Sequence, residues 1–234
     1  MNLIQMNYNL KKDIIQWDIE IWSKSLDFWG DEINISTPLK CLEIGSRQGG
    51  LSLWAAIYGN SVICSDLFLP SDSESVRNLH TKYDVTKNIS YEAIDVLDIP
   101  YDNYFDIVLM KSVLPSLGDS KDMEIQRIAL KSIFKSLKPG GKLLFAENLE
   151  ATFLHRISRK WFVKWGKKVK YLKTNEVITL LNEFGELKFI TKGFFSSFGR
   201  NETQRKFLGK IDTLLDKATP SQWKYLMIGI LKKK

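Results

Sequence analysis

The segment from residue 39 to residue 50, LKCLEIGSRQGG, places a short apolar strand, an acidic residue and a glycine-rich turn directly before a predicted helix. The apolar run includes Glu43, the chain turns at Gly45, and Gly49 and Gly50 precede the stretch LSLWAA. Glycine at a strand-to-helix turn lets the backbone approach a ligand closely, and the first turn of the helix presents free N–H groups. The segment therefore predicts a strand–turn–helix unit of an α/β fold, with a ligand site at the turn.

The next predicted strand, residues 61–65, ends immediately before Asp66, which follows Gly45 by 21 positions. A carboxylate about 20 residues after such a turn is placed to accept hydrogen bonds from the hydroxyls of a ribose. Arg47 stands where the second glycine of a GxGxxG fingerprint would be. The pattern thus predicts a site for an adenosine cofactor but does not identify a nicotinamide.

Strand and helix patterns alternate along most of the chain, which predicts a doubly wound, mostly parallel α/β sheet. The predicted strands are residues 39–44, 61–65, 89–93, 105–110, 142–147, 187–194 and 223–231. The predicted helices are residues 49–58, 72–83, 121–137, 175–184 and 202–217. A capping box of Ser71 and Glu74 is expected at the start of the second of these helices. The last strand is almost entirely apolar, so we expect it to be buried on both faces.

The N-terminal region predicts an amphipathic helix over residues 8–29 with an aromatic face. That face consists of Ile14, Trp17, Ile21, Trp22 and Trp29. We expect residues 1–36 to form a helical extension that packs across the cofactor mouth, and residues 37–234 to form the cofactor-binding domain.

The net charge of +7 is distributed unevenly. Residues 1–150 carry 15 Lys and Arg against 21 Asp and Glu, whereas residues 151–234 carry 19 against 6. No apolar run reaches the roughly 18–20 residues of a membrane helix, and the first residues lack the order of a signal peptide. We therefore expect a cytoplasmic protein with an anionic partner, and Cys41 and Cys64 are expected to be buried thiols.

The basic segment, residues 155–173, concentrates this charge. Its part from 156 to 173 contains eight Lys and Arg, no acidic residue, and apolar residues at helical spacing, with a possible break at Gly166. Such a helix could lie on a membrane surface, bind an acidic substrate or cover the active site. It could equally pack its tryptophan face on the sheet and leave its lysines in water.

Further features follow in a fixed order: AIDV with Asp95 after the third strand, FDIV in the fourth, and LKPGGKLLFAE in the fifth. In this order and spacing the chain resembles the class I S-adenosylmethionine-dependent methyltransferases over residues 36–231. The resemblance implies a seven-stranded sheet whose last strand is antiparallel and lies between the fifth and the sixth. It also implies S-adenosyl-L-methionine as the cofactor.

The resemblance implies roles for individual residues. Glu43 and Gly45 would flank the methionine part of the cofactor, and Asp66 would bind the ribose. Asp95 would bind the adenine amino group, with Val96 against the ring. Further cofactor contacts are expected from Ser46, Gly49, Leu67 and Lys111. Arg47 departs from the small residue usual in this turn.

The acceptor is expected at the carboxyl ends of the fourth and fifth strands, near residues 110–118 and 146–156. The candidate catalytic residues are Glu147 and His155, with His155 as general base. The candidate acceptor-binding residues are Ser112, Arg156 and Arg159. Metal-assisted methyltransferases of the catechol type have an Asp after the fourth strand and Asp-Asn after the fifth. Glu147-Asn148 resembles the second part of this pattern, but Lys111 stands in place of the first Asp, so no metal is expected.

These observations predict a methyltransferase that acts on an oxygen of a small or saccharide-type acceptor. The acceptor is expected to be anionic, and a phosphorylated or lipid-linked saccharide is one such compound. An RNA methyltransferase is a second hypothesis because of the basic C-terminal third, although no RNA-binding module is visible and nucleic acid is not the expected partner. A nonenzymatic partner subunit that binds the cofactor is a third. Peripheral contact of residues 156–173 with a membrane surface remains open.

Overall fold

A seven-stranded sheet forms the centre of the molecule in the computed structural model, which describes residues 6–33, 38–118, 123–162 and 169–234. The strand order is β3-β2-β1-β4-β5-β7-β6. The strands are β1 (Lys40–Ile44), β2 (Ser61–Asp66), β3 (Ile89–Ala93), β4 (Phe105–Lys111), β5 (Leu137–Asn148), β6 (Gly185–Lys192) and β7 (Leu226–Lys233). The pairs among β1 to β5 are parallel, and β7 runs antiparallel between β5 and β6. The predicted fold and the position of the last strand are thereby confirmed.

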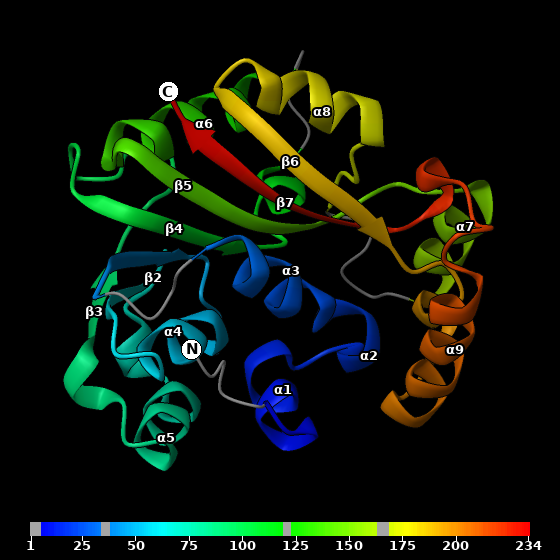
Figure 1. Cartoon of the computed structure of the whole chain (residues 1–234), viewed down its shortest axis with the longest axis horizontal. Helices are drawn as coiled ribbons and strands as arrows, with labels where there is room; N and C mark the ends of the chain where they lie inside the picture. Colours follow the sequence, from blue (N-terminus) through cyan, green and yellow to red (C-terminus); the bar gives the residue numbers. More distant parts are fainter. Residues whose placement is uncertain (1–5, 34–37, 119–122, 163–168) are drawn as a thin grey trace.

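Helices cover both faces of this sheet (Figure 1). One face carries α1 (Tyr8–Ile15), α2 (Ile19–Trp22), α3 (Lys24–Glu32), α4 (Gly50–Ala56) and α5 (Glu74–Lys82). The other face carries α6 (Glu124–Ser136) and α8 (Thr174–Asn182). Beyond one end of the sheet lie α7 (Phe153–Phe162) and α9 (Glu202–Leu215).

The strand periodicity of two explains why there are two cores. In β4, Ile107 and Leu109 belong to the cluster under α1–α4, whereas Val108 and Met110 belong to the cluster under α6 and α8. Successive side chains of a strand point to opposite faces, so an uninterrupted apolar run fills both. Burial on both sides makes β4 a rigid base for the residues at its carboxyl end.

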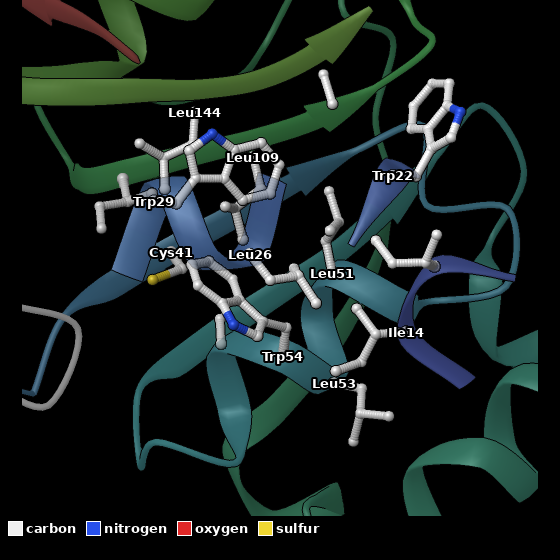
Figure 2. Close-up of a cluster of buried hydrophobic side chains, with 14 of the residues drawn as sticks. Ile14, Trp22, Leu26, Trp29, Cys41, Leu51, Leu53, Trp54, Leu109 and Leu144 are labelled. Atoms are coloured by element: carbon white, nitrogen blue, oxygen red, sulfur yellow. The ribbon is translucent and has the colours of Figure 1, made fainter. Parts of the chain in front are cut away.

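The N-terminal segment contributes to the core, as Figure 2 shows for Ile14, Trp22 and Trp29. The rings of Trp29 and Trp54 lie 5.6 Å apart, and the indole N–H of Trp29 donates to the carbonyl of Gly229 in β7 at 3.1 Å. Tryptophan burial of this kind contributes several kcal/mol, of the order of 3–5 on truncation to Ala. Helices α1–α3 share one core with the sheet. The predicted domain boundary at residue 36 stays a prediction.

The prediction of one helix over residues 8–29 is wrong, because the chain breaks twice. Gln16 and Asp18 have left-handed backbone conformations, with φ of 70° and 45°. The new start at α2 is supported from a distant part of the chain: the carboxylate of Glu202 accepts the N–H groups of Asp18 at 2.9 Å and Ile19 at 3.3 Å. A break that depends on a residue 184 positions away cannot be found from local periodicity.

Smaller differences concern element ends. The expected capping box of Ser71 and Glu74 does not form, because α5 begins at Glu74 with Ser73 as its N-cap. The fifth strand begins at Leu137 rather than at residue 142, because β4 pairs with it from there. Helix α7 begins before the basic segment, and the possible break at Gly166 lies outside the described residues. Cys41 and Cys64 are buried and free, as expected.

Asp18 is a fully buried carboxylate that joins the N-terminal helices to β7. Its Oδ2 accepts the hydroxyl of Tyr225, and its Oδ1 has no hydrogen-bond partner among the described residues. Burial raises the pKa of Asp18 from 3.8 to about 7, against the opposing hydrogen bond of Tyr225. The folded protein therefore holds a proton here that the unfolded chain releases at a lower pH.

We expect Asp18→Asn to change how stability depends on pH. Because the pKa of Asp18 is higher in the folded protein than in the unfolded chain, its titration lowers the free energy of unfolding as pH rises from about 4 to about 7. Above about pH 7 the contribution of Asp18 no longer changes with pH. Asn has the same shape as Asp and tolerates a left-handed backbone, but it does not titrate. Between about pH 4 and pH 7, the free energy of unfolding of the variant should therefore rise relative to that of the wild type by at most about 1.4 kcal/mol per pH unit. Urea unfolding at several pH values measures the difference. The exposed carboxylate variant Asp102→Asn is the control, and profiles for Asp18→Asn that run parallel to the wild type would contradict the assignment.

Candidate active site

The glycine turn between β1 and α4 has the conformation that its sequence predicts. Gly45 and Gly49 adopt positive φ values of 65° and 71°. The N–H of Ser46 donates to the carbonyl of Ser65 in β2 at 2.9 Å, and the N–H of Gly49 donates to the carbonyl of Ser46 at 2.8 Å. A β-carbon on Gly45 would lie 3.1 Å from Val113, which follows β4. The turn is therefore closed tightly over the carboxyl ends of three strands.

Asp66 ends β2 beside this turn. One carboxylate oxygen accepts the backbone N–H of Arg47 at 2.8 Å, and the other accepts that of Leu67 at 2.8 Å. Two backbone donors fix the orientation of the carboxylate, while each oxygen retains a lone pair for another donor. This is the geometry expected of a group that receives two neighbouring hydroxyls. Arg47 contributes its backbone here, in a left-handed conformation with φ of 51°.

Glu43 is buried beneath the turn and binds the start of α4. Its carboxylate accepts the N–H of Leu51 at 3.2 Å, and the N–H and hydroxyl of Ser52 at 2.8 and 2.5 Å. Burial raises the pKa of Glu43 to about 7, against the hydrogen bonds from Ser52 and the charge of Lys111. These contacts let Glu43 hold the glycine turn in place, and its direct contact with the methionine part stays a prediction.

The adenine side of the predicted site is an exposed edge. Asp95 lies two residues beyond β3, is exposed, and accepts the N–H of Leu97 at 2.9 Å. Val96 is buried in the core below, and Leu67 extends into solvent beside Asp66. The backbone joins the two acids, since the N–H of Ile94 donates to the carbonyl of Asp66 at 2.8 Å. The structure thus brings Asp66, Leu67, Asp95 and Val96 to one edge of the sheet, as the sequence predicts.

Helix α1 closes the turn from outside. The carbonyl of Ile14 faces Gly50 so closely that a β-carbon there would lie 2.0 Å away, and the ammonium of Lys111 donates to the carbonyl of Ile15 at 2.8 Å. Burial lowers the pKa of Lys111 to about 8, although the charge of Glu43 opposes the shift. Lys111 therefore connects α1 to the end of β4, and a contact of its side chain with the cofactor stays a prediction.

His80 of α5 also contacts the glycine turn, a contact that the sequence analysis does not predict. Its imidazole lies between the carbonyl of Gly49, 2.9 Å from Nε2, and the hydroxyl of Tyr91, 2.8 Å from Nδ1. A β-carbon on Gly49 would lie 2.7 Å from this ring. His80 thus stabilises the turn from below, and no motif of the sequence indicates that contact.

Glu147 lies at the carboxyl end of β5, opposite the loop that follows β4. Its Oε1 accepts the N–H groups of Val113 at 3.0 Å and Leu114 at 3.2 Å, and its buried Oε2 has no hydrogen-bond partner among the described residues. Burial raises the pKa of Glu147 to about 8, against those two hydrogen bonds. Next to it, the hydroxyl of Ser112 accepts the amide of Asn148 at 2.8 Å. Glu147 therefore positions the loop and is mostly protonated near neutral pH.

His155 is almost fully buried, in contrast to the expectation for a general base. Its Nδ1 lies 2.8 Å from the hydroxyl of Thr152, and its Nε2 lies 3.0 Å from the carbonyl of Phe194. Aromatic rings surround it, with that of Phe198 at 4.7 Å. Burial lowers the pKa of His155 to about 4, against the hydrogen bond to Phe194. A ring with both nitrogens occupied is poorly placed to remove a proton, so this geometry disfavours the predicted role.

The two predicted acceptor-binding arginines have different environments. Arg159 points inward, where its guanidinium donates to the carbonyl of Leu149 at 2.7 Å and lies 3.9 Å from the ring centre of Tyr171. Arg156 is exposed, with its guanidinium 3.8 Å from the carboxylate of Glu150. Only Arg156 is thus free to meet a partner from solvent. Within the described ranges, His, Cys, Asp and Glu side chains form no group of three or more that could hold a metal ion.

Comparisons with known proteins indicate a methyltransferase domain. A family model described as a methyltransferase domain matches residues 42–145, which include the glycine turn, Asp66 and Asp95. The ubiquinone/menaquinone biosynthesis C-methyltransferase UbiE of Haemophilus ducreyi is 30% identical over 152 residues, covering 62% of this chain and 54% of that protein. UbiE of Pasteurella multocida is 30% identical over 148 residues, covering 60% and 50%. The chain spans about half the length of these curated relatives.

Solved structures show the same fold. The YcgJ protein of Bacillus subtilis has a TM-score of 0.62 at 16% identity, over 90% of this chain and 98% of that one. The N-methyltransferase NodS of Bradyrhizobium japonicum has a TM-score of 0.55 at 16% identity, over 91% and 95%. Fold and glycine turn together are those of a Rossmann-like, nucleotide-binding α/β domain. The domain match and the UbiE relatives support a class I S-adenosylmethionine-dependent methyltransferase.

Proposed function

We propose that the chain binds S-adenosylmethionine across the carboxyl ends of β1, β2 and β3, and that it methylates a small acceptor at the ends of β4 and β5. The observation that carries this proposal is Asp66, whose carboxylate is oriented by two backbone N–H groups beside a closed glycine turn. When bound, the cofactor supplies an electrophilic methyl group on a sulfonium. The protein has to hold that group in line with the acceptor atom.

The described residues fit this cofactor. Gly45 lets the backbone approach the methionine part closely. Asp66 offers two acceptor oxygens to the ribose hydroxyls, and Asp95 offers an exposed carboxylate to the adenine amino group. The buried hydroxyl of Ser46 has no hydrogen-bond partner among the described residues, and it lies within the turn. A buried hydroxyl is stable only when it is paired, so a ligand that bonds to it is expected there.

The acceptor is best supported as a compound whose hydroxyl ionises without help from the protein. Of the two residues predicted to be catalytic, Glu147 binds two backbone N–H groups through one oxygen and His155 has both nitrogens bonded. A saccharide hydroxyl stays protonated at that pH and needs a base, whereas an acidic phenol or enol does not. This observation favours an anionic aromatic or enolic acceptor over the saccharide.

The ionised acceptor could take the methyl group on oxygen or on carbon. A phenolate carries negative charge on both its oxygen and its ring carbons, so the same site can support either outcome. The names of the UbiE relatives, ubiquinone/menaquinone biosynthesis C-methyltransferases, favour carbon and a quinone-type ring. We therefore include C-methylation of a quinol-type acceptor as the second candidate beside O-methylation.

Two measurements test the proposed function. Calorimetry should show that the protein binds S-adenosylhomocysteine with a single site. Incubation with methyl-labelled S-adenosylmethionine should then transfer label to an acidic phenol or enol, and a short-chain quinol tests the second candidate. Mass spectrometry of the product should locate the methyl group on oxygen or carbon. Absence of binding would overturn the cofactor assignment. Binding together with transfer to a saccharide phosphate alone would overturn the acceptor assignment.

We expect His155→Gln to lower stability without changing the pH profile of turnover. Glutamine cannot reproduce both bonds to Thr152 and Phe194, so the free energy of unfolding should fall by about 1–3 kcal/mol. Thermal unfolding and the pH dependence of kcat measure the two effects. If the variant instead unfolds normally and kcat falls by about 10²–10⁴, the general-base role predicted from the sequence is right.

A further inference from the structure

Helix α7 presents an apolar face to solvent, while two polar side chains on its opposite side point to the protein. Phe153 and Trp161 are 63% and 75% exposed, and Leu154 and Ile157 are exposed beside them. His155 and Arg159, on the opposite side of the helix, bond to backbone carbonyls of the protein. The possibility that the tryptophan face packs on the sheet is therefore wrong for Trp161. A surface helix of a soluble domain usually has the reverse orientation, so this face is expected to meet a partner.

Helix α9 repeats the pattern. Phe207 and Leu214, two turns apart, are 66% and 83% exposed. Lys206 and Lys210 are exposed on one flank of the helix, as helical spacing requires. The exposed Lys217, two residues past the end of α9, is counted with it. Likewise, the exposed Arg156 and Lys160 lie on one flank of the apolar face of α7. Each helix thus combines exposed apolar side chains with a flank of positive charge.

The two helices belong to one side of the molecule. Both contact the short 3-10 helix η5 (Ser196–Phe198), and Figure 1 shows them together beyond the end of the sheet. Helix α7 follows β5 after only four residues, and β5 ends at the predicted acceptor site. We call the exposed side chains of α7 and α9 the basic apolar surface. They are Phe153, Leu154, Arg156, Ile157, Lys160, Trp161, Lys206, Phe207, Lys210, Leu214 and Lys217.

We propose that the basic apolar surface binds the headgroup region of an anionic lipid membrane. Apolar side chains on such helices enter the boundary between headgroups and acyl chains, while lysine and arginine remain at the phosphates. No helix among the described residues is long and apolar enough to cross a membrane, so contact would be peripheral. Binding here would bring the end of β5 close to the lipid, where an apolar acceptor would be reached directly.

Charge and side-chain type favour this occupant over two others. A second copy of the chain would bring lysines against lysines, since residues 151–234 carry 19 basic and 6 acidic side chains. Nucleic acid would match the charge, and Phe153, Trp161 and Phe207 could stack on bases. The exposed aliphatic side chains of Leu154, Ile157 and Leu214 would have no partner there. A lipid surface accommodates both the aliphatic side chains and the positive charge.

Flotation with lipid vesicles tests the proposal on the full chain. The wild type should float with phosphatidylcholine vesicles that contain phosphatidylglycerol, should bind pure phosphatidylcholine much more weakly, and should be released in part by added salt. The double variant Trp161→Ser with Phe207→Ser should bind at least about tenfold more weakly, because two large exposed side chains no longer enter the lipid. Lys206→Gln with Lys210→Gln should remove part of the salt-sensitive binding.

Matched controls separate this result from misfolding. Ile128→Ser removes an exposed apolar side chain from α6, on the other side of the sheet, and should bind vesicles like the wild type. Every variant should keep its affinity for S-adenosylhomocysteine, so failure of the membrane proposal remains distinct from failure of the proposed function. The proposal is overturned if the wild type does not float, if both vesicle types bind equally, or if the double variant floats like the wild type. It is also overturned if the double variant loses only RNA binding or only self-association.

Discussion

Replacing Asp66 by alanine should weaken binding of S-adenosylhomocysteine by tenfold or more while leaving the fold intact. The carboxylate lies at the solvent-facing end of β2, so its loss creates no cavity in the core. A hydrogen bond to a charged group contributes roughly 1.5–3 kcal/mol, and two ribose hydroxyls are expected to donate to this carboxylate. The lost bonds to Arg47 and Leu67 would add to the effect, because they orient the turn.

Calorimetry on Asp66→Ala should be accompanied by two further variants. Asp66→Asn keeps the acceptor oxygen without the charge and should bind with intermediate affinity. Asp102→Ala removes an exposed carboxylate that precedes β4, at the opposite edge of the sheet from the turn, and should bind like the wild type. Unchanged affinity in Asp66→Ala would remove the main support for the proposed cofactor site.

Local patterns were sufficient to predict the sheet and to bring Asp66 and Asp95 to one of its edges. Apolar runs of five to eight residues, separated by turns, identify strands because a buried strand needs apolar side chains on both faces. Asp66 and Asp95 follow two such strands, and the carboxyl ends of parallel strands meet at one edge, which is where the structure has them. The antiparallel position of β7 came from the family resemblance and not from the pattern itself.

Contacts between distant segments were not predictable in this way. The break before α2 depends on Glu202, and the place of His80 depends on packing between α5 and the glycine turn. The predictions for the acceptor side were the least accurate. A histidine at a given sequence position can point toward the acceptor or into the protein, and the sequence does not distinguish the two. Only the structure shows that His155 points inward to Phe194 while Phe153 and Trp161 point outward.

The buried N-terminal segment cannot be deleted without disturbing the core. Deleting residues 1–30 would be a natural test of a helix that covers the cofactor mouth. In the structure, however, Ile14, Trp22, Leu26 and Trp29 are buried in the core under the sheet. Their removal would expose that core, so lost activity would report unfolding. A substitution at the contact between α1 and the glycine turn tests the idea more directly.

Gly50 provides that contact. It is the first residue of α4, and its β-carbon would lie 2.0 Å from the carbonyl oxygen and 2.9 Å from the carbonyl carbon of Ile14. The obstacle is backbone, so no change of side-chain rotamer relieves it. Gly50 does not have a positive φ, so its backbone conformation suits alanine. Alanine in the interior of a helix is otherwise more stable than glycine by roughly 0.5–1 kcal/mol. Any loss in Gly50→Ala therefore reflects displacement of α1.

We expect Gly50→Ala to lower the free energy of unfolding by about 1–3 kcal/mol, as overpacking of a buried site does. Displacing α1 would also break the bond from Lys111 to Ile15 and loosen the turn that includes Gly45, so affinity for S-adenosylhomocysteine should fall as well. Urea unfolding and calorimetry measure the two effects. Gly59→Ala is the matched control: its β-carbon meets nothing within 4 Å, but its φ of +83° strains alanine, so it should lose stability while keeping its affinity. If Gly50→Ala binds like the wild type, α1 does not support the cofactor turn, and its role is confined to the core.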